Sequence, residues 1–294
     1  MAEIAIALEQ ALSRRRQHGE PGRTLPRVIT RGRGWTVADV VCTCGPSDLS
    51  YEERHAGYSI SVVLAGSFQY RSATGDALMT PGSLMLGNQG QCFECGHEHG
   101  EGDRCVSFWY APWHFERLAF DAGARGRVRF PVLRLPSLRP LAPLVARAAL
   151  GVAGTADIDW EELAARLAAH TIAIATGAPA DSSGLPRNAA ARVSHVVRTI
   201  DADPHEELTL EVLAEEAGLS AYHFLRTFER STGVTPHQYV LRARLRKAAM
   251  RLAGGSDPIT DVAFDSGFGD VSNFNRAFRG EFGVSPRAFR RTLR

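Results

Sequence analysis

The sequence lacks any long apolar segment. Its 294 residues are 44% hydrophobic and 22% charged, but no stretch approaches the ~20 apolar residues that a membrane-spanning helix requires. Residues 1–17 place Leu8 and Leu12 at helical spacing and predict a short amphipathic helix. Arg14 and Arg16 follow these apolar residues, the reverse of a secretory signal peptide. We therefore expect a cytoplasmic protein with no membrane partner.

Cysteine is scarce, and all of it lies in the first half of the chain. The five residues are Cys42, Cys44, Cys92, Cys95 and Cys105. An odd number of cysteines without an export signal argues against a disulfide framework and leaves reduced thiols or metal ligands.

A strong basic charge is also absent, since the net charge is only +2. From Arg187 to the end there are 16 basic and 13 acidic side chains, a net charge of +3. This mild surplus is compatible with DNA binding but does not establish it.

The chain divides by pattern into a β-rich and a helical part. Short apolar runs at 58–64 and 105–110, separated by glycine and proline, predict strands from Thr24 to Leu135 that form a barrel or sandwich. Alanine- and leucine-rich helices follow at 138–150 and 160–176, the second capped by Asp157 or Asp159. The predicted units are an effector domain with a short N-terminal helix at 1–135, a helical segment at 136–177, a linker at 178–188 and a DNA-binding domain at 189–294.

An internal repeat occupies the last hundred residues. Residues 213–220 are echoed by 262–269 at an offset of 49, and 233–236 by 283–286 at an offset of 50. In each copy a short helix ends at a glycine, Gly218 or Gly267, and Ser220 or Asp270 caps the next helix. This layout is that of a helix-turn-helix, whose second helix enters the major groove.

Helical geometry selects the candidate base readers. Paired phenylalanines, Phe224 with Phe228 and Phe274 with Phe278, face inward at i and i+4. The polar side chains on the other face are Tyr222, Arg226, Ser272, Asn273, Asn275 and Arg276. Arginine pairs with guanine and asparagine with adenine, so these residues are predicted to bind DNA. The basic residues between the motifs, from Arg242 to Arg251, are either surface charge or phosphate contacts.

The double motif resembles the DNA-binding domain of the AraC/XylS family of bacterial transcription regulators. Its second copy carries the clearest match, from Ile259 through Gly267 and Phe278 to Pro286. The resemblance implies two reading heads joined by a linker helix, here Pro236–Leu252, on adjacent major grooves. It also implies promoter DNA and RNA polymerase as partners, a cupin-like effector barrel, and a homodimer formed through the helices at 138–176.

The cupin part of the resemblance is looser. The turns at 65–68 and 80–84 look like those of the barrel. The pair of metal-binding histidines usual in cupins is missing, because only His55 stands at that place. The fold expected is therefore α+β: a cupin-like β-barrel followed by helices, then an all-α domain with two helix-turn-helix motifs.

A cluster of metal-ligand residues lies within the β-rich part. Cys92, Cys95, His97, His99 and Cys105 are candidate ligands for zinc or another transition metal. Strand alternation would place Cys95, His97 and His99 on one side and Cys92 on the other. Three interpretations stay open: metal binding, thiol redox sensing, and a buried cysteine beside exposed histidines. Cys42 and Cys44 could add ligands or a second redox pair.

These observations predict a non-enzymatic, DNA-binding transcription regulator whose N-terminal domain senses a small molecule, a metal or a redox change. The alternative is a DNA-repair regulator that accepts alkyl groups on a sacrificial cysteine. Against it, the cysteines lie in the barrel-like segment and show no resemblance to such a repair domain.

Overall fold

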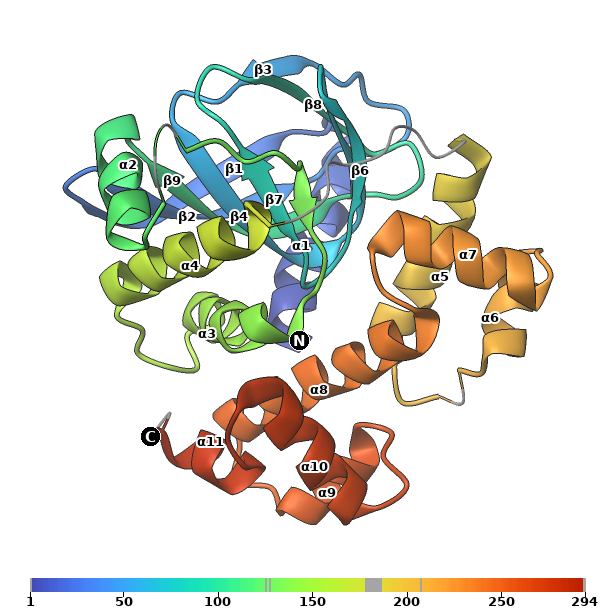
Figure 1. Ribbon diagram of the computed structural model, residues 1–294. Helices are drawn as coiled ribbons and strands as arrows, with labels where there is room; N and C mark the ends of the chain where they lie inside the picture. Colours follow the sequence, from blue (N-terminus) through green and yellow to red (C-terminus); the bar gives the residue numbers. More distant parts are fainter. Residues whose placement is uncertain (1, 125, 127, 178–186, 207, 293–294) are drawn as a thin grey trace.

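The computed structural model describes residues 2–124, 126, 128–177, 187–206 and 208–292. It is an α+β protein, with a sheet domain followed by helices (Figure 1). Most of the predicted linker at 178–188 lies outside the described residues. No described helix is long and apolar enough to cross a membrane.

Two antiparallel sheets form the N-terminal domain. The six-stranded sheet has the order β1-β2-β9-β4-β7-β10, and the four-stranded sheet has the order β3-β8-β5-β6. The strands are β1 Thr24–Gly32, β2 Trp35–Cys42, β3 Glu52–Arg54, β4 Tyr58–Gly66, β5 Phe68–Ser72, β6 Gly75–Met79, β7 Leu84–Gly87, β8 Cys92–Gly96, β9 Asp103–Tyr110 and β10 Arg134–Leu135. The sheets are paired as two separate ladders, so the closed barrel expected from the sequence is not established.

Period-two alternation gives the central strands two different faces. On β9, Val106 and Phe108 are fully buried in the main core, whereas Ser107 points to the opposite face. On β4, Ile60 belongs to the same core and Ser61 bonds Ser107, Oγ to Oγ, at 2.9 Å. One face of the sheet therefore packs against helices, and the other turns polar groups toward the second sheet.

The helical layer includes one element that the sequence pattern did not predict. Helix α2, Pro112–Asp121, lies inside the region expected to be β structure, and it buries Phe115 and Ala119. The predicted helices are present as η1 Arg139–Leu141 with α3 Ala142–Val152, and as α4 Trp160–Ala175, capped by Asp159. Helix α1, Ala2–His18, buries Leu8 and Leu12 against the sheet.

The C-terminal helices form two similar units along one long helix. They are α5 Arg187–Ala202, α6 Leu210–Glu216, α7 Ala221–Thr232, α8 Pro236–Gly254, α9 Ile259–Asp265, α10 Val271–Phe282 and α11 Pro286–Thr292. Helix α8 has 19 residues and is therefore about 28 Å long. It begins with a capping box between Thr235 and Gln238, followed by Pro236 at the first helical position.

The sheet domain is packed against both C-terminal units. Leu78 of β6 is buried in the core of the first unit, together with Phe224 and Phe228. Ala146 and Leu150 of α3 belong to the core of the second unit. The helical segment that follows the sheets is thus largely buried within the same chain.

Candidate functional site

Two helix-turn-helix units present recognition helices built on the same plan. Gly218 and Gly267 have φ of +62° and +83°, the left-handed conformation that glycine adopts without strain. The side chains of Ser220 and Asp270 then cap α7 and α10 by accepting hydrogen bonds from the backbone amides three residues on, those of His223 and Asn273. The predicted turns and caps are confirmed.

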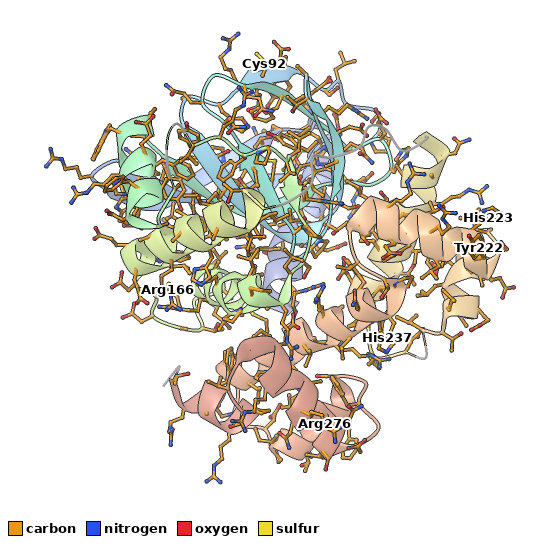
Figure 2. All side chains as sticks on the ribbon, viewed as in Figure 1. Cys92, Arg166, Tyr222, His223, His237 and Arg276 are labelled. Atoms are coloured by element: carbon orange, nitrogen blue, oxygen red, sulfur yellow. The ribbon has the colours of Figure 1, made fainter. Side chains whose placement is uncertain are left out.

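The predicted reading residues lie on the solvent side of these helices. Phe224, Phe228, Phe274 and Phe278 are all fully buried. The six candidates are exposed: Tyr222, Arg226, Ser272, Asn273, Asn275 and Arg276. In Figure 2, Tyr222 and Arg276 point outward, away from the sheet domain. Exposure leaves these side chains available to a partner, and base contact by them remains a prediction.

The two reading surfaces differ in chemistry. On α7, Arg226 donates a hydrogen bond to the Tyr222 hydroxyl at 3.3 Å, and its guanidinium lies 5.9 Å from the ring centroid. His223 is also exposed beside Tyr222, and the sequence prediction omitted it (Figure 2). The repeat offers the missed signal, because His223 occupies the place that Asn273 has in the second unit.

The basic residues of α8 are engaged in contacts within the chain. Arg242 pairs with Glu281 at 3.4 Å, and Arg246 pairs with Asp201 at 3.1 Å. The others behave similarly: Arg244 donates to the carbonyls of Pro204 and Glu206, Lys247 lies 4.0 Å from Asp203, and Arg251 pairs with Asp257 and Asp265. These contacts hold both units against α8, so these cations have a structural role within the chain.

A cavity of about 430 Å³ lies between the two sheets. Its polar groups include Ser61 and Ser107 from the six-stranded sheet and Glu53 from β3, and its apolar wall includes Phe93 and Met85. Ligand sites of this kind are mostly apolar with a few fixed polar groups. The cavity is therefore a candidate effector site within the N-terminal domain.

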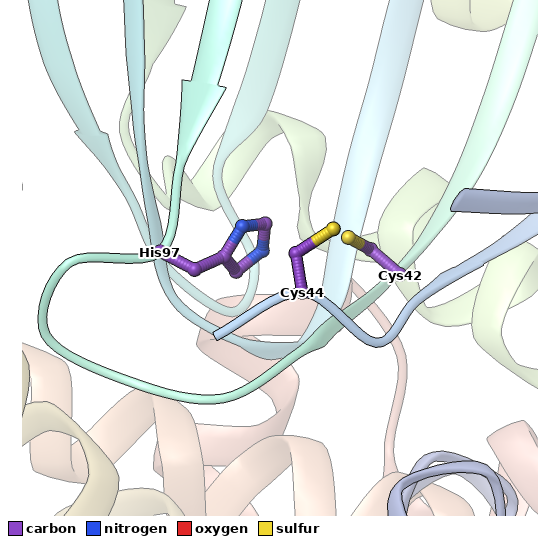
Figure 3. A group of neighbouring side chains, drawn as sticks. All are labelled: Cys42, Cys44 and His97. Carbon is purple, nitrogen blue, oxygen red and sulfur yellow. The ribbon is translucent and has the colours of Figure 1, made fainter. Parts of the chain in front are cut away.

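The predicted metal cluster is only partly gathered. Cys95, His97 and Cys105 line the cavity, whereas Cys92 and His99 do not. Within the described part of the chain, the group whose ligand atoms converge is Cys42, Cys44 and His97, all within 4.8 Å of one another (Figure 3). Of the five predicted ligands, only His97 belongs to this group. The sequence names its two partners, Cys42 and Cys44, only as additional ligands.

His97 is held in a polar network. Its Nε2 lies 2.7 Å from Asp103 Oδ1, and Cys105 Sγ donates to Asp103 Oδ2 at 3.3 Å. Burial opposes the charged form of the imidazole, but its bonds to Asp103 and Cys42 and the Asp103 charge together raise the pKa of His97 to about 10. Metal-binding histidines commonly have such a carboxylate partner.

Burial also sets the reactivity of the cysteines. It is the main cause that raises the pKa of the Cys95 and Cys105 thiols, with the Asp103 charge adding to it. Cys44 is different, because its hydrogen bond with Cys42 lowers its pKa. A protonated, buried thiol is a poor nucleophile, so Cys95 and Cys105 give no support to the alkyl-accepting alternative.

Comparison with known proteins identifies the C-terminal region. A family described as "Helix-turn-helix domain" matches residues 213–292, which include both motifs. The chain is 37% identical over 103 residues to the HTH-type transcriptional activator RhaS of Escherichia fergusonii, covering 35% of this chain and 37% of that one. It is 29% identical over 100 residues to the HTH-type transcriptional regulator MtrA of Neisseria gonorrhoeae, covering 34% and 33%. The match thus spans about a third of the length of each relative.

The chain is also similar in part to solved structures. The DNA-binding domain of AdpA, in complex with a target DNA, is 30% identical and covers 34% of this chain and 91% of its own, with a TM-score of 0.34. ToxT from Vibrio cholerae is 15% identical and covers 89% of this chain and 99% of its own, with a TM-score of 0.36. The double motif and the sequence relatives define a helix-turn-helix DNA-binding domain. The C-terminal domain, residues 213–292, is therefore of the AraC type.

Proposed function

We propose that this protein is a sequence-specific transcription regulator that binds promoter DNA through α7 and α10 and senses a signal in its sheet domain. The observation that carries the proposal is the repeated recognition helix, capped and packed alike in both units, with polar side chains exposed on its outer face. Such helices insert into the major groove, where exposed polar side chains reach base edges.

The second head carries most of the base specificity in this proposal. Asn273, Asn275 and Arg276 are exposed there, and asparagine and arginine make bidentate bonds to adenine and guanine. On α7, Arg226 is engaged with Tyr222 and must exchange that contact for one with a base. We therefore assign the first head a smaller share of sequence discrimination and a larger share of backbone positioning.

The sheet domain is the proposed sensor, a cupin-like fold around the cavity. A cavity of about 430 Å³ suits a small molecule with an apolar body and one or two polar groups. The serine hydroxyls on β4 and β9 and the Glu53 carboxylate would fix its orientation. A metal signal would act on the same space, because Cys42 and His97 also line it.

The homodimer and the contact with RNA polymerase stay predictions. Helix α3, one half of the expected dimer segment, is mostly buried against the chain's own α8 and α10. Helix α4 presents Glu161, Glu162, Arg166 and His170 to solvent. A dimer through this segment would therefore use the polar outer face of α4.

The test begins with selection of binding sites from random duplex DNA by the full-length protein. We expect one preferred site with two half-sites a helical turn apart. Arg276→Ala should then weaken binding by ~1–3 kcal/mol and relax preference at one base pair.

Arg117→Ala is the matched control, because Arg117 is an exposed helical arginine on α2, outside both recognition helices and outside the proposed dimer face. It should leave affinity and preference unchanged. Equal losses in both variants, or no selected site at all, would refute the assignment.

A further inference from the structure

We propose that Cys42, Cys44 and His97 form a binding site for one thiophilic cation, with zinc as the reference ion. Two thiolates and an imidazole are a ligand set that zinc prefers. Tetrahedral zinc places such ligand atoms about 3.5–3.8 Å apart. The three groups already lie within 4.8 Å of one another, so small side-chain rotations complete the geometry (Figure 3).

Strand register brings this site together from distant parts of the chain. Cys42 is the last residue of β2 and pairs directly with Asp103, the first residue of β9. Asp103 in turn bonds His97, which follows β8 of the other sheet. A carboxylate on the imidazole fixes the orientation of the ring before any ion binds, as in known zinc sites.

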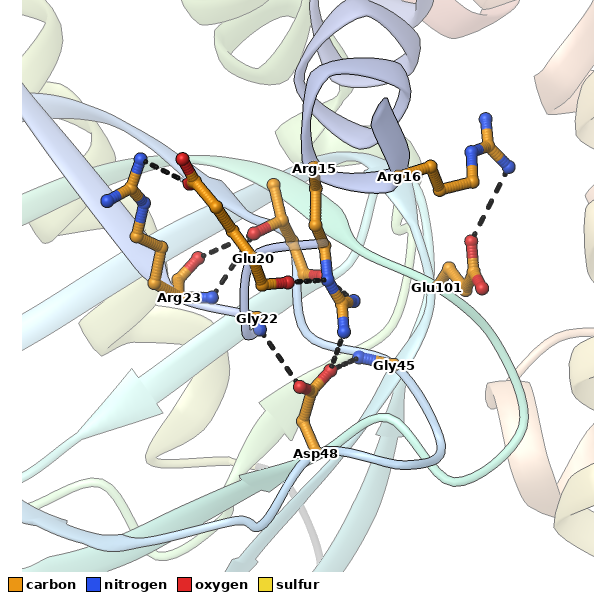
Figure 4. A network of polar contacts seen from close by, with 9 residues as sticks. Arg15, Arg16, Glu20, Gly22, Arg23, Gly45, Asp48 and Glu101 are labelled. Carbon is orange, nitrogen blue, oxygen red and sulfur yellow. Dashed lines mark hydrogen bonds and ion pairs between the residues drawn. The ribbon is translucent and has the colours of Figure 1, made fainter. Parts of the chain in front are cut away.

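The loop that carries Cys44 is anchored on both sides. Asp48 accepts hydrogen bonds from the amides of Gly22 at 2.9 Å and Gly45 at 2.7 Å, and it pairs with Arg15 of α1 at 2.6 Å (Figure 4). Arg15 also donates to the carbonyl of Thr43, the residue between the two cysteines. The spacing of Cys42 and Cys44 is therefore held by the fold rather than by the ion.

Three protein ligands leave a fourth coordination position. Cys42 and His97 line the cavity between the sheets. A bound ion would therefore turn its open position toward that cavity and accept water or an effector there, as three-ligand zinc sites do. The cation site and the cavity then form one sensing unit.

The loop that follows His97 touches the DNA-binding domain. Arg198 of α5 donates a hydrogen bond to the carbonyl of His99, two residues beyond His97. It also packs against Gly100, where an added Cβ would lie 2.9 Å from its guanidinium. A change in the position of His97 on ion binding is passed by this loop to α5. The coupling of this site to DNA binding rests on the proposed function.

The binding experiment uses reduced, metal-free, full-length protein titrated with Zn²⁺ alone. We expect one equivalent per chain and protection of Cys44, the partly exposed thiol of the site, from a thiol reagent. Cys44→Ser should abolish both effects, and Asp103→Asn should weaken binding about 10- to 100-fold. Cys92→Ser is the matched control and should bind like the wild type, because Cys92 lies outside the cavity at the other end of β8.

Substoichiometric zinc in the wild type, or a loss of binding in Cys92→Ser, would overturn the site. Circular dichroism shows whether each variant folds. If Cys44→Ser does not fold, the thiol count on the wild type still decides, since protection of none or of other cysteines contradicts the proposal.

The coupling experiment measures affinity for the selected DNA with and without Zn²⁺. We expect zinc to change the Kd of the wild type at least about 5-fold. Arg198→Ala should bind one zinc but lose this change. Zinc binding together with zinc-independent DNA binding would refute the signal while leaving the proposed regulator intact. Absence of sequence-specific DNA binding would instead refute the regulator and leave the ion site standing.

Discussion

At the scale of single residues, His55 is a buried histidine with a structural role. Its Nε2 is 2.8 Å from the Tyr70 hydroxyl, and its Nδ1 is 3.2 Å from Ser59 Oγ. The ring is stacked on Phe93 at a centroid distance of 4.1 Å. Burial lowers the pKa of His55 from 6.5 to about 4. His55 is thus a neutral histidine that packs within the sheet domain.

This shift predicts a pH-dependent stability of the sheet domain. The unfolded state binds a proton below pH 6.5 that the folded state accepts only near pH 4. The stabilisation is therefore complete above pH 6.5 and is lost as the pH falls, by up to about 3 kcal/mol. Urea unfolding of His55→Gln at pH 7.5 and pH 5 should show a smaller loss than the wild type. Parallel pH curves for the two proteins would contradict this account.

The exposed reading residues were predictable because the pattern is local. Once Phe274 and Phe278 are assigned inward, the 3.6-residue period fixes which neighbours face solvent. The contact of Arg226 with Tyr222 could not be predicted from the sequence, since it depends on the side-chain rotamers of two exposed residues.

At the scale of elements, two turns of the second unit depend on glycine for different reasons. Gly267 has φ of +83°, and a Cβ there would lie 2.8 Å from the His205 Cα and 2.9 Å from Arg244 Nε. Gly283 has φ of +77° but no neighbouring atom within 4 Å. Conformation alone constrains Gly283, whereas conformation and packing both constrain Gly267.

Alanine substitutions should separate the cost of the left-handed conformation from the cost of the steric contact. Gly283→Ala should cost about 1–2 kcal/mol, the penalty of a left-handed residue with a side chain. Gly267→Ala should cost more, because the backbone of His205 must also move. Urea unfolding followed by circular dichroism measures both values. Equal losses would show that the turn relaxes without strain.

The unpredicted helix α2 shows where element prediction from sequence failed. Pro112 marks a helix start, and Phe115 and Ala119 have the i, i+4 spacing of a buried face. The sequence pattern predicts β structure for 24–135 as a whole, because short apolar runs separated by glycine and proline dominate it. Helices of the C-terminal units were easier, since each carries its own cap and glycine.

At the scale of the whole molecule, the cation site could not be predicted as a set. The sequence clusters its cysteines and histidines around 92–105, which favours a local site. The structure instead uses the register of β2 with β9 to bring Cys42 to Asp103, some sixty residues away. Non-local pairing of this kind is fixed by the fold and leaves no short-range pattern in the chain.

Docking of the sheet domain fixes the two reading heads relative to one another. Leu78 of β6 is 2% exposed and packs in the core of the first head. Arg134 binds the carbonyls of Leu78 and of Ser231 on α7, and Arg139 binds the carbonyl of Gly280 on α10. A signal in the sheet domain therefore has direct contacts through which to reorient either head.

Leu78→Asp tests this docking, because it places a charge in the apolar contact with the first head. We expect each domain to stay folded while the first head separates from the sheets. The radius of gyration in small-angle scattering should increase, and hydrogen exchange should accelerate at the end of α7 around Ser231. Leu25→Asp is the matched control, since Leu25 is 42% exposed on β1 and should change neither measurement. A compact Leu78→Asp protein with unchanged exchange would show that the contacts of Arg134, Arg139 and Arg198 hold the heads without this leucine.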